Sequence, residues 1–141
     1  MSSDRRATVR SAEGSAGKPL RVLCAEDDVH LSELLKRALE GAGHLVECAA
    51  DGQHALERLT ADLKFFDVLI TDHRMPRLSG LKLVERIRQT DFSGKIIVHS
   101  SHLPEFDATA YLAFAVDHIF TKPTQFMELL KVVQRMRVTV P

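Results

Sequence analysis

The chain has 141 residues, of which 45% are hydrophobic, so it is large enough for one domain with a buried core and cramped for two. Lysine and arginine total 19, as do aspartate and glutamate, and this zero net charge gives no basic field that would predict a nucleic-acid partner. Because the sequence has no secretory signal and no apolar run long enough to cross a bilayer, we expect a cytoplasmic protein without a membrane partner. Cys24 and Cys48 lack the spacing of metal ligands and are expected to be small, reduced core side chains.

Composition and periodicity set the expected boundaries. Residues 1–19 have almost no large apolar side chain and should form a flexible leader, since they bury too little surface to offset the entropy of ordering. The folded domain should cover 20–138, and 139–141 should form a tail. Short apolar runs predict strands at 20–25, 45–49, 67–71, 95–99 and 117–121. Apolar residues at helical spacing predict helices at about 29–41, 51–63, 81–90, 104–114 and 125–137.

Strands that alternate with helices through short connections predict a parallel sheet with helices on both faces, because parallel strands need a crossover. The fold class is therefore α/β, a doubly wound, flavodoxin-like domain. The common strand order for five strands is 2-1-3-4-5, which places the switch point between the first and third strands. Ligands of such sheets bind at the carboxyl ends of the strands, next to that switch point.

Polar side chains follow four of the predicted strands. Glu26 and Asp27 follow the first strand, Asp72 the third, Ser100 the fourth and Lys122 the fifth. On the expected strand order, all of these residues lie at one edge of the sheet. A lone aspartate after a strand is commonly a turn or capping residue, but an acidic pair, a third acid, a hydroxyl and an ammonium at one edge indicate a binding site.

The chemistry of these groups indicates a metal and a phosphoryl group. Two carboxylates about 5 Å apart repel each other by roughly 3 kcal/mol at an effective dielectric constant near 20, so a cation should share the site. Hard oxygen ligands beside an open crevice suit Mg²⁺ or Mn²⁺ better than Zn²⁺. With a lysine and a serine nearby, the site could bind a phosphoryl group and let Asp72 attack phosphorus to form an aspartyl phosphate.

The ordered set of motifs resembles the receiver domain of two-component response regulators, the CheY-like family. The resemblance covers about 20–137, and its separate motifs are weak signals that become specific only in this order. The motifs are Glu26-Asp27-Asp28, Asp72 with Met75-Pro76 and Gly80, Ser100, and Lys122-Pro123.

The resemblance implies a role for each matching residue. Glu26 and Asp27 match the acidic pair that binds the metal, with Asp27 as the more direct ligand, and Asp28 matches a less involved acidic position. Asp72 matches the phosphoacceptor and a metal ligand, and Arg74 would offer its backbone carbonyl to the metal.

Two further matches come later in the chain. Ser100 matches the hydroxyl residue that turns toward the phosphoryl group, and Lys122 matches the lysine that pairs with phosphate. The bond into Pro123 would be cis. One position departs from the family pattern: the family usually has an aromatic residue three positions before the lysine, where this chain has Ile119, followed by Phe120. Isoleucine is stiff at χ1 and has no ring to swing, so the usual aromatic readout is in doubt.

The resemblance implies a phosphorylation-controlled switch. The chain would accept a phosphoryl group on Asp72 from a sensor histidine kinase or a phosphotransfer protein, in a Mg²⁺-dependent reaction, and would change its affinity for a downstream protein partner. It would catalyse only its own phosphorylation and dephosphorylation and would not otherwise be an enzyme. It could be a single-domain regulator or a receiver excised from a longer chain, and a homodimer is left open.

Three alternatives compete with this function. A pseudo-receiver that is never phosphorylated is favoured only by Ile119. A Mg²⁺-dependent phosphohydrolase that forms an aspartyl phosphate usually needs an Asp-x-Asp pair after its first strand, which this chain lacks. A Ser-His-Asp hydrolase built from Ser100, His73 and Asp27 is disfavoured because no nucleophile-elbow glycines surround the serine.

We interpret the aromatic residues of the helix at 104–114 as helix-packing residues, namely Phe106, Tyr111 and Phe114.

Overall fold

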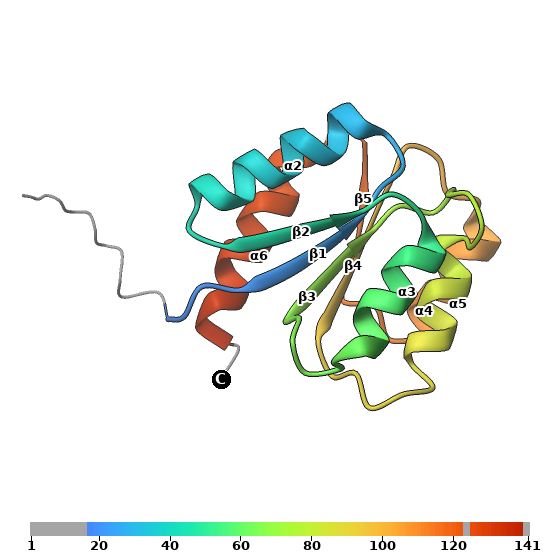
Figure 1. The fold of residues 1–141 in the computed structure, drawn as a ribbon. Helices are drawn as coiled ribbons and strands as arrows, with labels where there is room; N and C mark the ends of the chain where they lie inside the picture. The colour runs from blue at the N-terminus through green and yellow to red at the C-terminus, as the bar shows by residue number, and fades with distance from the viewer. Residues whose placement is uncertain (1–16, 123–124, 140–141) are drawn as a thin grey trace, which may run out of the picture.

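The computed structural model describes residues 17–122 and 125–139, and in this part of the chain a five-stranded sheet lies between two layers of helices (Figure 1). The strands are β1 (Arg21–Ala25), β2 (Leu45–Ala49), β3 (Val68–Thr71), β4 (Lys95–Ser100) and β5 (His118–Thr121). The helices are α2 (Val29–Gly41), α3 (Gly52–Ala61), α4 (Gly80–Ile87), α5 (Glu105–Ala113) and α6 (Phe126–Thr139). Most of the expected leader, the bond into Pro123 and the end of the expected tail lie outside the described residues.

All neighbouring strands pair in parallel, in the order β2-β1-β3-β4-β5. This finding confirms the predicted doubly wound sheet. The central strand β3 is buried along its whole length, as a strand covered on both faces must be, which explains its uninterrupted sequence of Val, Leu, Ile and Thr.

Alternate residues of each strand point to opposite faces and fill two separate cores. On one face Leu23, Leu69 and Val98 pack against residues of α3, α4 and α5. On the other face Val22, Ile70 and Ile97 pack against α2 and α6. Figure 1 shows α2 and α6 on one side of the sheet and α3, α4 and α5 on the other.

Side-chain caps start three of the helices close to the carboxyl ends of the strands. Asp28 accepts hydrogen bonds from the first amides of α2, Asp51 caps α3 and Ser79 caps α4. Each cap satisfies amides that have no partner within the helix. The caps therefore fix the residue at which each of these helices begins.

Three predicted helix ends differ from the structure by two or three residues. The helix expected at 81–90 ends at Ile87, where the hydroxyl of Thr90 donates to the Ile87 carbonyl. The helix expected to reach residue 63 ends at Ala61, and the last helix extends to Thr139. Phe106 was expected to pack against other helix residues, but it is 83% exposed.

No helix of the described residues is long and apolar enough to cross a membrane.

Candidate functional site

Three residues that follow strands are still held by backbone hydrogen bonds of the sheet. The amide of Glu26 donates to the carbonyl of Ala49 at 3.0 Å, and the amide of Asp72 donates to the carbonyl of Ala25 at 2.9 Å. The amide of Lys122 donates to the carbonyl of Ser100 at 3.0 Å. Because the ladder continues for one residue past each strand, it fixes the starting direction of these charged side chains.

Lys122 lies between two of the acids. Its Nζ is 2.6 Å from Glu26 Oε1 and 2.9 Å from Asp72 Oδ2, although the partners are 96 and 50 positions away in the sequence. The side chains of Lys122, Glu26 and Asp72 are 13%, 3% and 12% exposed, respectively, so these ion pairs are shielded from water. Charge-assisted hydrogen bonds of this length are strong. The predicted meeting of these three residues at one edge is thus observed.

Burial and ion pairing act in opposite directions on these groups. Burial alone would lower the pKa of Lys122, but its hydrogen bonds to Glu26 and Asp72 outweigh that effect and the pKa is raised. Burial raises the pKa of Glu26 above its usual value, although the hydrogen bonds from Lys122 and from the Asp28 amide oppose this rise. Lys122 is therefore a permanent cation at neutral pH.

The carboxylate of Asp27 joins the other two acids. One oxygen each from Glu26, Asp27 and Asp72 lies within 4.8 Å of the others, and Asp27 itself is exposed to solvent. Repulsion between charges at that spacing is about 3 kcal/mol per pair at an effective dielectric constant near 20, and the single lysine carries one positive charge against three carboxyl groups. Oxygen donors that are partly open to water fit a hard divalent cation such as Mg²⁺.

The remaining predicted residues are less directly engaged. The hydroxyl of Ser100, which is 6% exposed, donates to the backbone carbonyl of His102 at 3.0 Å and so binds within its own loop. The side chain of Arg74 is exposed in the loop after β3, and the metal contact of its carbonyl stays a prediction. The carboxylate of Asp28 is occupied as the cap of α2, which agrees with its expected lesser role.

A hydrogen-bonded cluster beside the acids was not predicted. The backbone amide of His73 donates to Asp72 Oδ1 at 2.6 Å. The ring of His73 contacts the hydroxyl of Tyr111 and the carboxylate of Asp107, both on α5. The sequence places Tyr111 among apolar helix residues, and its hydroxyl was the available signal that it needs a polar partner when buried.

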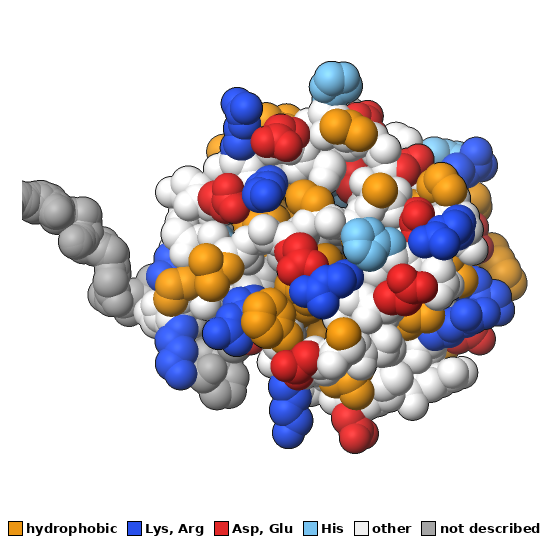
Figure 2. All heavy atoms as spheres, in the orientation of Figure 1, with side chains coloured by type: hydrophobic (Ala, Val, Ile, Leu, Met, Phe, Trp, Pro, Cys, Tyr) orange, Lys and Arg blue, Asp and Glu red, His pale blue; other side chains and the backbone are white. Residues whose placement is uncertain are grey.

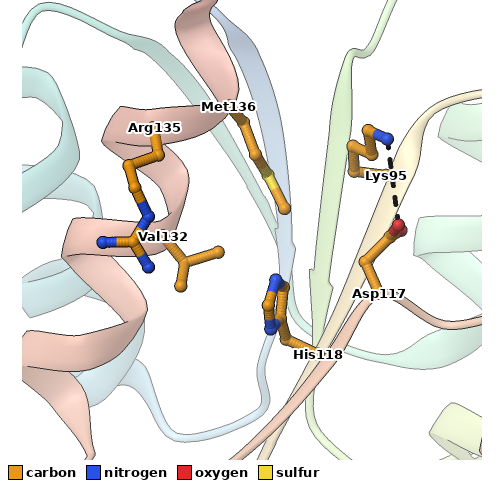
Figure 3. Close-up of a pocket in the computed structure, with 6 residues that line it drawn as sticks. All are labelled: Lys95, Asp117, His118, Val132, Arg135 and Met136. Carbon is orange, nitrogen blue, oxygen red and sulfur yellow. Dashed lines mark ion pairs between the residues drawn. The ribbon is translucent and has the colours of Figure 1, made fainter. Parts of the chain in front are cut away.

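The groove drawn in Figure 3 lies at the other end of the sheet, where β4 and β5 begin. Its volume is about 270 Å³ and it is lined by Lys95, Asp117, His118, Val132, Arg135 and Met136. Lys95 and Asp117 form an ion pair across one wall, with 3.9 Å between nitrogen and oxygen. A hollow of about 200 Å³ borders Glu26 and Asp27 instead, so open space is also available beside the acids.

The strand order and the lysine-linked acids at the carboxyl edge define the class of the protein. The model of the response regulator receiver domain family matches residues 22–134, so the chain belongs to this family. This finding confirms the resemblance drawn from the motifs.

Curated relatives with similar sequences are regulators. The chain is 33% identical over 114 residues to the transcriptional regulatory protein TrcR of Mycobacterium tuberculosis, covering 81% of this chain and 44% of TrcR. It is 34% identical over 112 residues to the response regulator MprA of Mycolicibacterium vanbaalenii, covering 79% of this chain and 48% of MprA. The match thus spans less than half the length of these relatives.

Solved structures agree in fold. The chemotaxis protein CheY4 of Vibrio cholerae superposes with a TM-score of 0.74 at 28% identity, covering 83% of this chain and 98% of CheY4. A response regulator receiver protein from Pseudomonas putida superposes with a TM-score of 0.77 at 28% identity, covering 84% and 98%. Both comparisons confirm the predicted fold class.

Proposed function

We propose that the chain is a phosphorylation-controlled switch that accepts a phosphoryl group on Asp72. The observation that carries the proposal is the position of Lys122 Nζ, which touches both Glu26 and Asp72 while the carboxylate of Asp27 lies beside them. This arrangement combines a nucleophilic carboxylate, a fixed cation and clustered carboxylate oxygens in one place. Family membership supports the same assignment.

In the proposed reaction a carboxylate oxygen of Asp72 attacks the phosphorus of a phosphohistidine on a sensor histidine kinase or a phosphotransfer protein. A P–O bond forms, the P–N bond breaks, and the electron pair of that bond stays on the imidazole nitrogen. With acetyl phosphate as donor, acetate leaves instead. Lys122 would offset part of the charge of the three phosphoryl oxygens, and its two ion pairs hold it in place before the donor arrives.

The acids are suited to hold the metal that such chemistry uses. Glu26, Asp27 and Asp72 would supply carboxylate oxygens and Arg74 a backbone carbonyl, a ligand set that fits Mg²⁺ or Mn²⁺. When bound, the ion would neutralise negative charge on the transferring phosphoryl group. Both oxygens of Glu26 and of Asp72 already accept one hydrogen bond, from Lys122 Nζ or from the backbone amide of Asp28 or His73. A carboxylate oxygen has two lone pairs, so each can still accept a further contact.

The proposed output is a change in affinity for a downstream protein partner. Ser100, at the end of β4, would turn from its own loop toward the phosphoryl group, and the chain would catalyse no reaction other than its own phosphorylation and dephosphorylation. A cytoplasmic setting accords with the free thiols of Cys24 and Cys48. On the face in Figure 2, acidic and basic side chains of the described residues are interspersed, which accords with a protein partner and not with a polyanion.

The test is to incubate the protein with Mg²⁺ and acetyl phosphate and to measure intact mass and base-labile phosphate. We expect one added phosphoryl group in the native protein and in Asp28→Asn, which removes a nearby charge but keeps a residue that can cap α2. Asp72→Asn should take up none. Labelling of Asp72→Asn at the native rate would overturn the assignment.

A pseudo-receiver remains the second candidate because of Ile119, which is partly buried against the core on the α3–α5 face and offers no ring to rotate. That alternative requires that the native protein acquires no label. Rapid release of phosphate from many monoesters would instead favour a phosphohydrolase.

A further inference from the structure

The imidazole of His73 connects the loop after β3 to the helix α5. Its Nδ1 lies 2.7 Å from the hydroxyl of Tyr111, and its Nε2 lies 3.3 Å from Asp107 Oδ2. The side chain of His73 is 12% exposed, and Tyr111 is completely buried. Tyr111 and Asp107 are four positions apart, so both side chains lie on the same face of α5.

Each ring nitrogen of His73 has a polar partner on α5. Burial raises the pKa of Tyr111, so its hydroxyl stays protonated and can donate to Nδ1. On the other side of the ring, Nε2 lies 3.3 Å from Asp107 Oδ2, a close polar contact. The ring thus contacts α5 through both of its nitrogens.

The same residue touches the predicted phosphoacceptor through its main chain. The His73 amide donates to Asp72 Oδ1 at 2.6 Å, and the His73 carbonyl accepts from the amide of Gly80 at 2.8 Å. Little free space surrounds this link, because a Cβ on Gly80 would lie 2.1 Å from the Asp72 carbonyl oxygen and 2.7 Å from the Tyr111 hydroxyl. This close packing leaves little room for the Asp72 and Tyr111 groups beside Gly80 to move independently of each other.

We propose that His73, Tyr111 and Asp107 form a bridge that couples the phosphorylation state of Asp72 to the position of α5, in place of the aromatic residue that Ile119 replaces. The inference rests on the proposed function. When Asp72 becomes an aspartyl phosphate, one of its oxygens becomes the bridging oxygen of a mixed anhydride, the other becomes a neutral carbonyl oxygen, and the negative charge lies on the phosphoryl group. The amide of His73 then has a weaker acceptor at Asp72 and a stronger one on the phosphoryl group. Reorientation of that amide carries the ring and, through Tyr111 and Asp107, the helix.

Tyr111 and Asp107 act in this scheme through His73 and are positioning residues. Their removal should separate chemistry at Asp72 from its structural effect on α5. Ile119 cannot supply a parallel route by ring rotation, because a β-branched aliphatic side chain has no ring and little χ1 freedom. The experiment therefore measures whether loss of the bridge uncouples phosphorylation of Asp72 from the change in α5.

The experiment compares amide hydrogen exchange of α5 in the native protein with and without Mg²⁺ and beryllofluoride, a phosphoryl mimic that binds the acceptor carboxylate. The full chain is used throughout, as the native form and as Tyr111→Phe, Asp107→Asn and Thr109→Ala. Thr109 is an exposed residue of α5 that donates to the Glu105 carbonyl, so its substitution controls for a change in helix stability. Uptake of phosphate from acetyl phosphate is measured on the same samples.

We expect the mimic to change exchange rates in α5 by at least about fivefold in the native protein and in Thr109→Ala. In Tyr111→Phe and Asp107→Asn the change should shrink to less than about twofold, while both variants still acquire the phosphoryl group. Native-like changes in both variants would overturn the bridge and leave the proposed function intact. Failure of the native protein to acquire phosphate would overturn both.

Discussion

Lys122 Nζ lies 2.6 Å from Glu26 Oε1, and the two side chains are only 13% and 3% exposed. The same ammonium forms a second ion pair with Asp72 Oδ2, at 2.9 Å. A buried carboxylate without a partner is strongly destabilising, since it loses hydration and gains no compensating contact. The lysine that we assign to phosphate binding therefore also stabilises the fold while no phosphate is bound.

We expect Lys122→Met to lower the free energy of unfolding at pH 8 by about 3 kcal/mol, as is usual when one partner of a buried ion pair is removed. Added Mg²⁺ should recover part of the loss, because it supplies positive charge to the same acids. Urea denaturation with and without Mg²⁺ measures both effects. Lys82→Met is the control: its partner Glu85 and its own side chain are exposed, so the loss should stay below about 1 kcal/mol. Equal losses in the two variants would contradict the assignment.

The strand ends could be predicted from the sequence because topology alone brings them together. Short apolar runs identify the strands, the parallel order follows from the crossovers, and Glu26, Asp72 and Lys122 each come directly after a run. To predict that these side chains meet, one needs only the backbone direction of the first residue after each strand. The backbone hydrogen bonds that continue the sheet ladder set that direction.

The cluster around His73 could not be predicted because it depends on how α5 is rotated about its axis. His73 and Tyr111 are 38 positions apart, and a small rotation of the helix would move Tyr111 away from the loop. The observed orientation of α5, which buries Tyr111, leaves Phe106 at 83% exposure, although its place among the apolar residues of the helix suggested that it packs. Neither outcome is encoded in the local periodicity, since α5 is apolar on more than one side.

The close packing at Gly80 makes a second stability prediction. A Cβ at this position would overlap the Asp72 carbonyl and the Tyr111 hydroxyl, so Gly80→Ala should lower the free energy of unfolding by about 2–3 kcal/mol. At Gly41, the last residue of α2, an added Cβ would meet no packed neighbour within 4 Å, and Gly41→Ala should raise stability by about 0.5–1 kcal/mol through helix propensity. Thermal and urea unfolding of Gly80→Ala and Gly41→Ala measure both changes in stability. An unchanged free energy of unfolding in Gly80→Ala would show that the loop after β3 can shift to accommodate the added Cβ at little cost.

The buried imidazole of His99 should make the fold less stable in acid. Both ring nitrogens are buried without a hydrogen-bond partner among the described residues, and burial, together with the charge of Lys122, lowers the pKa of His99 to about 4. The unfolded chain binds this proton near the usual histidine pKa of about 6.5. As the pH falls from that value toward 4, the unfolded state takes up the proton first, so stability falls by at most about 1.4 kcal/mol per pH unit.

We expect His99→Leu to be more stable than the native protein at pH 5, with a flatter loss of stability between pH 6.5 and 4. Urea denaturation across that range gives the slope. His30→Gln, at an exposed position of α2, controls for the loss of an imidazole as such. If His99→Leu and the native protein lose stability in parallel, the buried imidazole does not cause the acid sensitivity.

Neighbouring acids should differ in their effect on metal affinity. Asp27 offers an exposed carboxylate to the cluster with Glu26 and Asp72, whereas the carboxylate of Asp28 already accepts two amides of α2. Asp27→Asn removes a negative ligand and should weaken Mg²⁺ binding at least about tenfold, since hard cations depend on ligand charge. Asp28→Asn removes the same charge one residue away, keeps the cap, and should change affinity less than about threefold. Titration calorimetry measures both variants, and equal losses would mean that the summed local charge, and not direct coordination by Asp27, determines the affinity.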